Sequence, residues 1–378
     1  MKYTYWYLIL FVITFYACDD NKQTIIETTP STHTLKKVGE YEIEIDSVTA
    51  NNFIHYQHYV DNGTEYFTFL NRVTQEINFY DLEKKSLSFK VPLPLQGPNA
   101  VGNIEGFNSG YHIHNLDSIF VVNRNARRLL VLNSKSVKIG EIDFSRYGYQ
   151  PTPVLAPFAP MSIIDDQAYF LNIQGNIDYM GRNISYGSDY ASVIDLKTSG
   201  KEYFLSYPES YTKGTWGLDL HRLSWAINDD NHFVVSYPID EHLYEYDLYG
   251  NLINTHRAQT NKVKKVKSIK KKQMTLRGSQ EYYASQGKYG QVFYDTVRNI
   301  YLRDSFSPVS KSDIQAGLIN EYERPLIILD KSFKKIGEFN EPSKNQLVLF
   351  FNEDGIHKCI QGANEDLLKF EIYALSTI

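Results

Sequence analysis

The sequence predicts an all-β fold, a six-bladed β-propeller whose ring is closed by an N-terminal outer strand added to the last blade. Three observations lead to this prediction. Apolar runs that end in Asp or Asn before a turn recur along the chain, four strands make up each repeat, and the last repeat is one strand short. The composition agrees, since 14% of the residues are aromatic, including 30 tyrosines, and aromatic residues favour strands.

Each repeat is recognised by the hairpin formed by its third and fourth strands. The third strand ends in Asp or Asn, whose side chain can bond to the backbone of the following turn. These turn residues are Asp81, Asn133, Asp195, Asp247 and Asp330. Two further strands precede each hairpin, as at residues 111–114 and 119–123. The repeats are about 57 residues long, near the range of propeller blades.

The string Lys-Ile-Gly-Glu, or Lys-Val-Gly-Glu, marks some of the outer strands. It occurs at residues 138–141 and 335–338, in each case after a strand and a turn. A third copy at residues 37–40 has no strand before it, whereas the last repeat ends one strand short at residues 369–375. We therefore expect residues 36–45 to supply the missing outer strand, which would remove an open sheet edge.

The N-terminus has the features of a secretory signal. Lys2 is followed by an apolar stretch at residues 5–15, which is too short to span a bilayer. The segment ending in Ala17-Cys18 resembles a bacterial lipobox, and the acidic residues after it resemble the surface-export signal of Bacteroidetes lipoproteins. We expect lipidation at Cys18 and anchoring to the outer membrane, facing the periplasm or the cell surface. The alternative is a plain secretory signal with a free cysteine.

The predicted chain organisation follows from this N-terminus. Residues 1–17 are the signal peptide, residues 18–35 a Thr-rich flexible tether, and residues 36–378 the propeller. Lipidation of Cys18 would leave Cys359 alone, so we expect no disulfide. Because Cys359 lies in a strand-like run, we expect it to be a small buried hydrophobic residue.

Several stretches together carry a family resemblance. They are the signal with its acidic continuation, the blade repeats, the turn Leu-Gln-Gly-Pro-Asn-Ala-Val at residues 95–101, and the strands at residues 290–295 and 299–303. In these the chain resembles a family of six-bladed, TolB-like propeller lipoproteins of Bacteroidetes that is catalogued as a domain of unknown function. The resemblance implies the fold and the anchor, and it brings no catalytic residue to any position of this chain.

The long loops are expected to share one face of the propeller, where binding residues tend to lie. Arg can bond bidentately to carboxylates or phosphates, and aromatic side chains can stack on sugars or pack against peptide. We therefore name a candidate ligand mouth, with ordinary salt bridges and loop packing as the alternative. Its residues are Arg72, Arg124, Arg127, Arg303, Asp304, Tyr179, Tyr186 and Trp216.

Other polar groups are expected to be structural. The basic run at residues 262–272 is expected to be solvated or disordered, with contact to an anionic partner as the alternative. The paired aspartates at residues 165–166 and 229–230 are expected to be turn residues. Histidines could build a metal site in the channel, but no carboxylate or Cys at ligand spacing accompanies them, so we predict none. They are His55, His58, His112 and His114.

The functional class is predicted mainly by exclusion. A net charge of −5 argues against nucleic-acid binding, and the chain has no nucleotide-binding or hydrolase motif. We expect a monomeric, non-enzymatic binding module without a cofactor, held at the membrane by its lipid and contacting a surface protein or glycan. The alternative is a hydrolase or lyase that acts on carbohydrates or lactones. That enzyme would show three or more His, Asp or Glu side chains converging in the channel.

Overall fold

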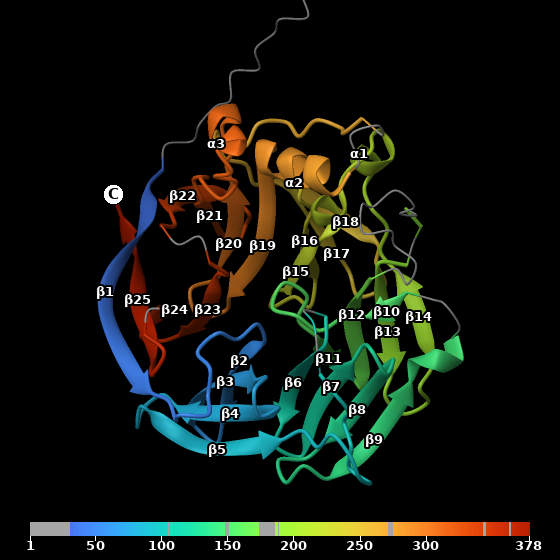
Figure 1. The fold of residues 1–378 in the computed structure, drawn as a ribbon. Helices are drawn as coiled ribbons and strands as arrows, with labels where there is room; N and C mark the ends of the chain where they lie inside the picture. Colours follow the sequence, from blue (N-terminus) through green and yellow to red (C-terminus); the bar gives the residue numbers. More distant parts are fainter. Residues whose placement is uncertain are drawn as a thin grey trace, which may run out of the picture.

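The computed structural model describes residues 31–104, 106, 108–147, 151–173, 186–187, 189–270, 275–342, 345–362 and 364–378. The predicted all-β propeller is confirmed, because mostly antiparallel sheets, several of them with four strands, are arranged around a central axis (Figure 1). In the sheets that consist of exactly four strands, the strands follow one another in chain order. Cys18 and Tyr179 lie outside the described residues.

Four of the sheets are separate from one another. The first contains β2 (Tyr56–Asp61), β3 (Thr64–Asn71), β4 (Glu76–Asp81) and β5 (Ser86–Pro92). The second contains β6 (Gly110–Asn115), β7 (Ser118–Asn123), β8 (Arg128–Leu132) and β9 (Lys138–Asp143). The third contains β11 (Ser162–Ile164), β12 (Gln167–Ile173), β13 (Ala191–Asp195) and β14 (Lys201–Phe204), and the short β10 (Thr152–Pro153) also pairs with β12. The fourth contains β15 (Ser224–Ile227), β16 (Phe233–Ser236), β17 (His242–Tyr246) and β18 (Leu252–Arg257).

The remaining strands are joined in one sheet, in the order β19-β20-β21-β22-β1-β25-β24-β23. Its halves meet at a single parallel pairing between His33 and Gly337. A side chain at Gly337 would collide with the carbonyl group of His33, so only glycine permits this approach. The strands are β1 (His33–Glu44), β19 (Lys288–Asp295), β20 (Ile300–Phe306), β21 (Pro325–Asp330), β22 (Lys335–Asn340), β23 (Val348–Asn352), β24 (Gly355–Ile360) and β25 (Leu367–Thr377).

The N-terminal strand β1 pairs with the C-terminal strand β25, as the sequence predicted. The antiparallel register runs from His33 opposite Thr377 to Glu44 opposite Leu367. In Figure 1 the two strands lie side by side at the edge of the molecule. β1 also buries Leu35 and Ile43, so both packing and backbone hydrogen bonds hold it in place.

The repeated Lys-Ile-Gly-Glu string forms a β-bulge in each of its copies. The register between the paired strands skips Val38 in β1, Ile139 in β9 and Ile336 in β22, the residue before the glycine in every copy. Val38 and Ile139 are each 56% exposed. A bulge twists an outer strand and disturbs its free edge, which discourages pairing with another chain.

The predicted turn residues also take their expected role. The Asp330 carboxylate accepts hydrogen bonds from the backbone N–H groups of Ser332 and Lys334, at 2.9 and 3.0 Å. Asp81, Asn133, Asp195 and Asp247 accept equivalent bonds from the turns that follow them. Asp165 and Asp166 have φ angles of 48° and 61°, which confirms that they are turn residues.

The hydrophobic core is divided among the spaces between neighbouring sheets. One cluster joins the first sheet to the β23–β25 strands through Phe67, Phe350 and Phe370, together with Ile43 of β1. Polar contacts between sheets accompany the packing. The Gln57 side chain both donates to and accepts from the backbone of Ile113, at 2.8 and 2.7 Å. Cys359 is buried, as predicted, and burial raises the pKa of its thiol.

Helices occur in the long loops at one end of the molecule. They are α1 (Glu209–Thr212), α2 (Leu276–Ser285) and α3 (Lys311–Gln315), and Figure 1 shows them on the same side. In the part of the chain that the structure describes, none of the helices has the length and apolar character needed to cross a membrane.

Candidate functional site

A cavity of about 280 Å³ opens on the axis at the long-loop end. Its lining comes from the residues just before β2, β11, β21 and β23, from the start of β15, from the third and fourth residues of β19 and from the end of β20. The first, third and fourth sheets and both halves of the joined sheet therefore contribute to one pocket, which rests on strand ends rather than on long flexible segments. The lining residues are Ile54, Pro157, Phe158, Arg222, Ser224, Gly290, Gln291, Asp304, Phe306, Arg324, Gln346 and Leu347. We call this the axial pocket.

A buried ion pair forms one wall of the axial pocket. Arg324 donates from Nε and Nη2 to the two carboxylate oxygens of Asp304, at 2.9 and 2.7 Å. Asp304 is 2% and Arg324 4% exposed. Burial lowers the pKa of Arg324, but the charge and hydrogen bonds of Asp304 outweigh this effect and raise it. The bidentate geometry fixes both side chains, so Asp304 is a rigid acceptor and not a free base.

Gly290 keeps the floor of the pocket open. A Cβ atom at this position would lie 2.9 Å from the Phe306 ring and 3.2 Å from the Asp304 carboxylate. The strand also bulges here, since the register between β19 and β20 shifts between Tyr289 and Val292. The bulge turns Gly290 and Gln291 toward the axis, where both line the pocket.

Amide groups in the pocket have hydrogen-bonding capacity to spare. Gln291 is half-buried, and its amide has no partner among the described residues. Gln346 donates to the carbonyl group of Ile54 at 3.1 Å, which leaves its Oε1 without a described partner. Arg222 is exposed and pairs with Asp219 at 3.1 Å. These groups above apolar walls suit a ligand with neutral hydrogen-bonding groups and an apolar face.

A buried lysine lies beside the axial pocket. Lys288 is 5% exposed, and its ammonium group sits 3.8 Å from the centroid of the Tyr283 ring and 5.4 Å from that of Phe306. It donates to the carbonyl group of Tyr283 at 3.3 Å. Burial lowers the pKa of Lys288 to about 8, despite the opposing charges of Asp219 and Asp304. Lys288 thereby ties the end of α2 to the start of β19.

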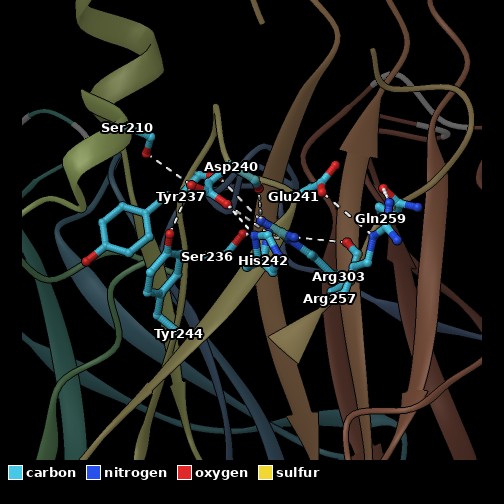
Figure 2. Close-up of polar contacts among 11 residues, drawn as sticks. Ser210, Ser236, Tyr237, Asp240, Glu241, His242, Tyr244, Arg257, Gln259 and Arg303 are labelled. Atoms are coloured by element: carbon cyan, nitrogen blue, oxygen red, sulfur yellow. Dashed lines mark hydrogen bonds and ion pairs between the residues drawn. The ribbon is translucent and has the colours of Figure 1, made fainter. Parts of the chain in front are cut away.

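The structure places Arg303 inside the protein and not at a ligand mouth. Its guanidinium is fully buried and donates to Ser236 Oγ at 3.0 Å and to the carbonyl groups of Ala258 and Asp240 at 2.9 and 2.8 Å. Figure 2 shows Arg303 reaching from β20 into this group of fourth-sheet residues. Because successive strand residues point to opposite faces, Arg303 enters the sheet interface while Asp304 faces the axial pocket.

The two described aromatic candidates are also part of the interior. Trp216 is 7% exposed, and its Nε1 donates to the carbonyl group of Tyr211 at 2.9 Å. Tyr186 is half-buried, and its hydroxyl lies 3.2 Å from Nε2 of His221. Burial lowers the pKa of His221 to about 4. These residues pack in the hydrophobic cluster between the third and fourth sheets, which uses the tyrosine rings as core.

The three other arginines lie in turns away from the axial pocket. Arg72 is exposed and donates to the carbonyl group of Gly106 at 2.5 Å. Arg127 donates to the carbonyl group of Phe144 at 3.3 Å. Arg124 is half-buried, which lowers the pKa of its guanidinium. Of the described candidates, only Asp304 lines the pocket, so the structure does not bring the predicted set together.

The histidines are distributed over both ends of the channel. His112 and His114 line a second cavity of about 380 Å³ at the opposite end, and burial lowers the pKa of His112 to about 4. His58 lies 3.0 Å from the Glu65 carboxylate and stacks on Phe350. His55 is buried against Gly110. Within the described residues, no three His, Cys, Asp or Glu side chains are grouped so that they could hold a metal ion.

Sequence reasoning missed most of the axial pocket. Arg222, Gln291 and Gln346 lie at or just before the innermost strands, whereas the prediction favoured the residues that follow the second strands. The starts of the innermost strands are the points where a propeller brings its blades closest together. The sequence signal for the pocket was therefore a residue's position at the start of an innermost strand. This position predicts which residues meet at the axis better than residue type does.

Comparison with solved structures shows similar folds. A member of the DUF4221 family from Bacteroides vulgatus superimposes with a TM-score of 0.77 and 20% identity, over 92% of this chain and 99% of that one. A presumed exported protein from Bacteroides fragilis has a TM-score of 0.59 and 10% identity, over 90% and 95% of the two chains. Virginiamycin B lyase from Staphylococcus aureus reaches only 0.45 at 10% identity, over 90% and 99%. That likeness carries no information on chemistry.

Comparison with sequences gives the family. No curated protein sequence matches this chain. Residues 32–340 match the family described as Domain of unknown function (DUF4221), and these residues make up most of the chain. The chain therefore belongs to the DUF4221 family.

Proposed function

We propose that this protein is a lipid-anchored extracytoplasmic binding module, a six-bladed propeller whose axial pocket recognises a surface protein or glycan. The observation that carries the proposal is the axial pocket itself. It combines the Gln291 amide and the Gln346 Oε1 atom, which have no partner among the described residues, with apolar walls, on strand ends that need little reorganisation. A hydrolase or lyase would place a free carboxylate or imidazole here. In this pocket, both carboxylate oxygens of Asp304 accept hydrogen bonds from Arg324.

The six-blade count and the closure of the ring are part of this proposal. In our assignment the sixth blade consists of β23, β24, β25 and β1, so the two chain ends supply one sheet. The buried cluster that joins β1, β23 and β25 to the first sheet supports closure. A closed ring keeps the strand ends around the axial pocket at fixed separations.

The binding role predicts a selective loss in the Gln291→Leu variant. Leucine keeps the size of the side chain but removes the amide, so a polar group of the ligand would be left unpaired. Such a loss costs about 1–3 kcal/mol, equivalent to roughly 5- to 150-fold in affinity. We expect the immobilised variant to recover at least about fivefold less partner from solubilised outer membranes than the wild type does.

The control for this experiment is Gln280→Leu. Gln280 is exposed on α2, and its amide has no described partner. Recovery by this variant should match the wild type. Equal recovery by wild type and Gln291→Leu would remove the axial pocket from the proposal, and loss in both variants would indicate non-specific adsorption.

The anchor predicts that Cys18→Ser releases the protein from membranes. Serine cannot be thioether-linked to diacylglycerol, and each buried CH₂ group of an acyl chain contributes about 0.8 kcal/mol to membrane binding. We expect the wild type to fractionate with outer membranes and the variant to be soluble. Cys359→Ser, which changes the other cysteine, should leave fractionation unchanged. Membrane retention of Cys18→Ser would contradict the lipoprotein assignment.

A further inference from the structure

The basic segment before α2 is held against the protein at residues 262–270. The described lysines of the run are exposed, as expected of a solvated run, whereas every third residue between them is turned inward. Val266 and Ile269 are 6% and 5% exposed, and Val263 is half-buried. The packing gives this segment one inner side and one outer side. We call its outer side, formed by Lys264, Lys265, Lys267 and Lys270, the lysine ridge.

Hydrogen bonds join the same segment to two other parts of the chain. The backbone N–H of Ile269 donates to the carbonyl group of Thr215 at 2.9 Å. The backbone N–H of Lys267 donates to Gln286 Oε1 at 3.0 Å, and its carbonyl group accepts from the Tyr282 hydroxyl at 2.7 Å. Close packing adds to this, because a Cβ atom at Gly287 would lie 3.2 Å from Cα of Val263. The backbone of the ridge is therefore positioned before any partner arrives.

The charges of the lysine ridge are not compensated by ion pairs within the described residues. All four lysines are exposed, and none has an ion-pair partner in the described part of the chain. Lys262 differs, because it pairs with Glu323 at 2.7 Å. In a flexible segment the lysine side chains could move apart and reduce their mutual repulsion. An anchored segment keeps these like charges close together, which costs electrostatic free energy. Fixed and unpaired positive charges indicate an anionic partner.

A groove of about 600 Å³ lies between α2, α3 and the basic segment, which contributes Ile269 from its inner side. Ile269 and Tyr282 belong both to the groove and to the contacts that anchor the segment. The carboxylate of Glu281 in the groove is paired with Arg277 at 2.8 Å, while Lys311 adds a further positive charge. The other lining groups are mostly small and polar, which suits a chain with hydroxyl groups. They are Thr275, Gly278, Ser285, Gln286, Ile314 and Gln315.

We propose that the groove and the lysine ridge bind a linear acidic polysaccharide. Its sugar units would lie in the groove against Tyr282, and its carboxylates would face the ridge. Lys264, Lys267 and Lys270 are three residues apart, which spans at most about 10 Å per step in an extended chain. Such a row matches a polymer with regularly spaced charges. A concave groove favours a polymer over the flat surface of an anionic bilayer.

The test measures binding to polygalacturonate by titration calorimetry. The protein is the full chain with Cys18→Ser, which removes the lipid attachment site. We expect binding that weakens as salt rises, because exposed charge pairs are screened. The triple variant Lys264→Gln, Lys267→Gln and Lys270→Gln should bind about tenfold more weakly, the combined effect of three exposed ion pairs.

The matched control is Lys135→Gln, Lys331→Gln and Lys334→Gln. These three lysines are exposed, have no described ion-pair partner and change the net charge equally. The control should remain within about twofold of the parent protein, since only the net charge differs. Equal weakening in both triple variants would show a net-charge effect and overturn the proposal, as would the absence of any binding to polygalacturonate.

Two further measurements complete the test. Fully methyl-esterified polygalacturonate should not bind, because its carboxylates are neutral, and undiminished binding would overturn the role of the ridge. Vesicles of phosphatidylcholine with phosphatidylglycerol test the lipid alternative. Ridge-dependent sedimentation with these vesicles, without binding to the polymer, would replace the polysaccharide by an anionic membrane surface. Thermal melting of both triple variants should match the parent, since all the replaced side chains are exposed.

Discussion

The Ile43→Ala variant is expected to lose about 2–5 kcal/mol of unfolding free energy, the usual range for removing a large apolar side chain from a core. Ile43 is 1% exposed and belongs to the cluster that joins β1, β23 and β25 to the first sheet. Val38→Ala, on the same strand, should lose no more than about 0.5 kcal/mol, because Val38 is 56% exposed at a bulge. Urea denaturation of both variants measures the difference.

A larger change to the same strand extends the test. Removing residues 32–46 would leave β25 paired with β24 alone and expose the apolar groups that Leu35 and Ile43 cover. We expect this deletion to abolish a single cooperative unfolding transition. Equal stability of Ile43→Ala and Val38→Ala would show that β1 is an accessory strand, and an unchanged transition after the deletion would show the same.

The second large effect is expected at Arg303. Arg303→Ala should lower the unfolding free energy by at least about 3 kcal/mol, because each buried acceptor left unpaired costs about 1–3 kcal/mol. The acceptors are Ser236 and the carbonyl groups of Ala258 and Asp240. The Tyr289 ring, whose centroid lies 3.9 Å from the guanidinium carbon, would also lose its contact. Urea denaturation again provides the measurement.

Arg72 provides the matched control for Arg303. Both arginines come from second strands or the turns directly after them, but Arg72 is exposed. Arg72→Ala should change the unfolding free energy by no more than about 0.5 kcal/mol. Arg303→Lys should remain strongly destabilised, because a lysine cannot reach three separate acceptors with fixed geometry. A stable Arg303→Lys variant that recovers less partner from membranes would instead assign Arg303 to ligand binding.

The contrast between Arg303 and Asp304 shows why the predicted site was incomplete. The two residues are adjacent and both polar, so residue type could not separate a buried structural group from a pocket wall. The strand pleat sends them to opposite faces. Which face meets the axis depends on how β20 is oriented between its neighbours, and this is a property of the assembled sheets. The aromatic candidates failed for a related reason, because Trp216 and Tyr186 are drawn into the packing between sheets.

The sequence of the basic segment carries the pattern that anchors it. Val263, Val266 and Ile269 recur every third residue among the lysines. This period is neither that of a strand nor that of a helix, so the sequence alone predicts a charged loop. The structure shows that the three apolar residues anchor the segment, and that the lysines are left on its outer side.

The sequence by itself determined the local features of this protein: the strands, the Asp and Asn turns, and the pairing of its first strand with its last. These follow from alternation, turn chemistry and the count of strands, which act over a few residues or are visible as repeats. Only the tertiary structure decided which side chains meet at the axis, which charges are buried and which lysines are held together. Those outcomes depend on contacts between sheets that are distant in the chain, where burial and geometry outweigh residue type.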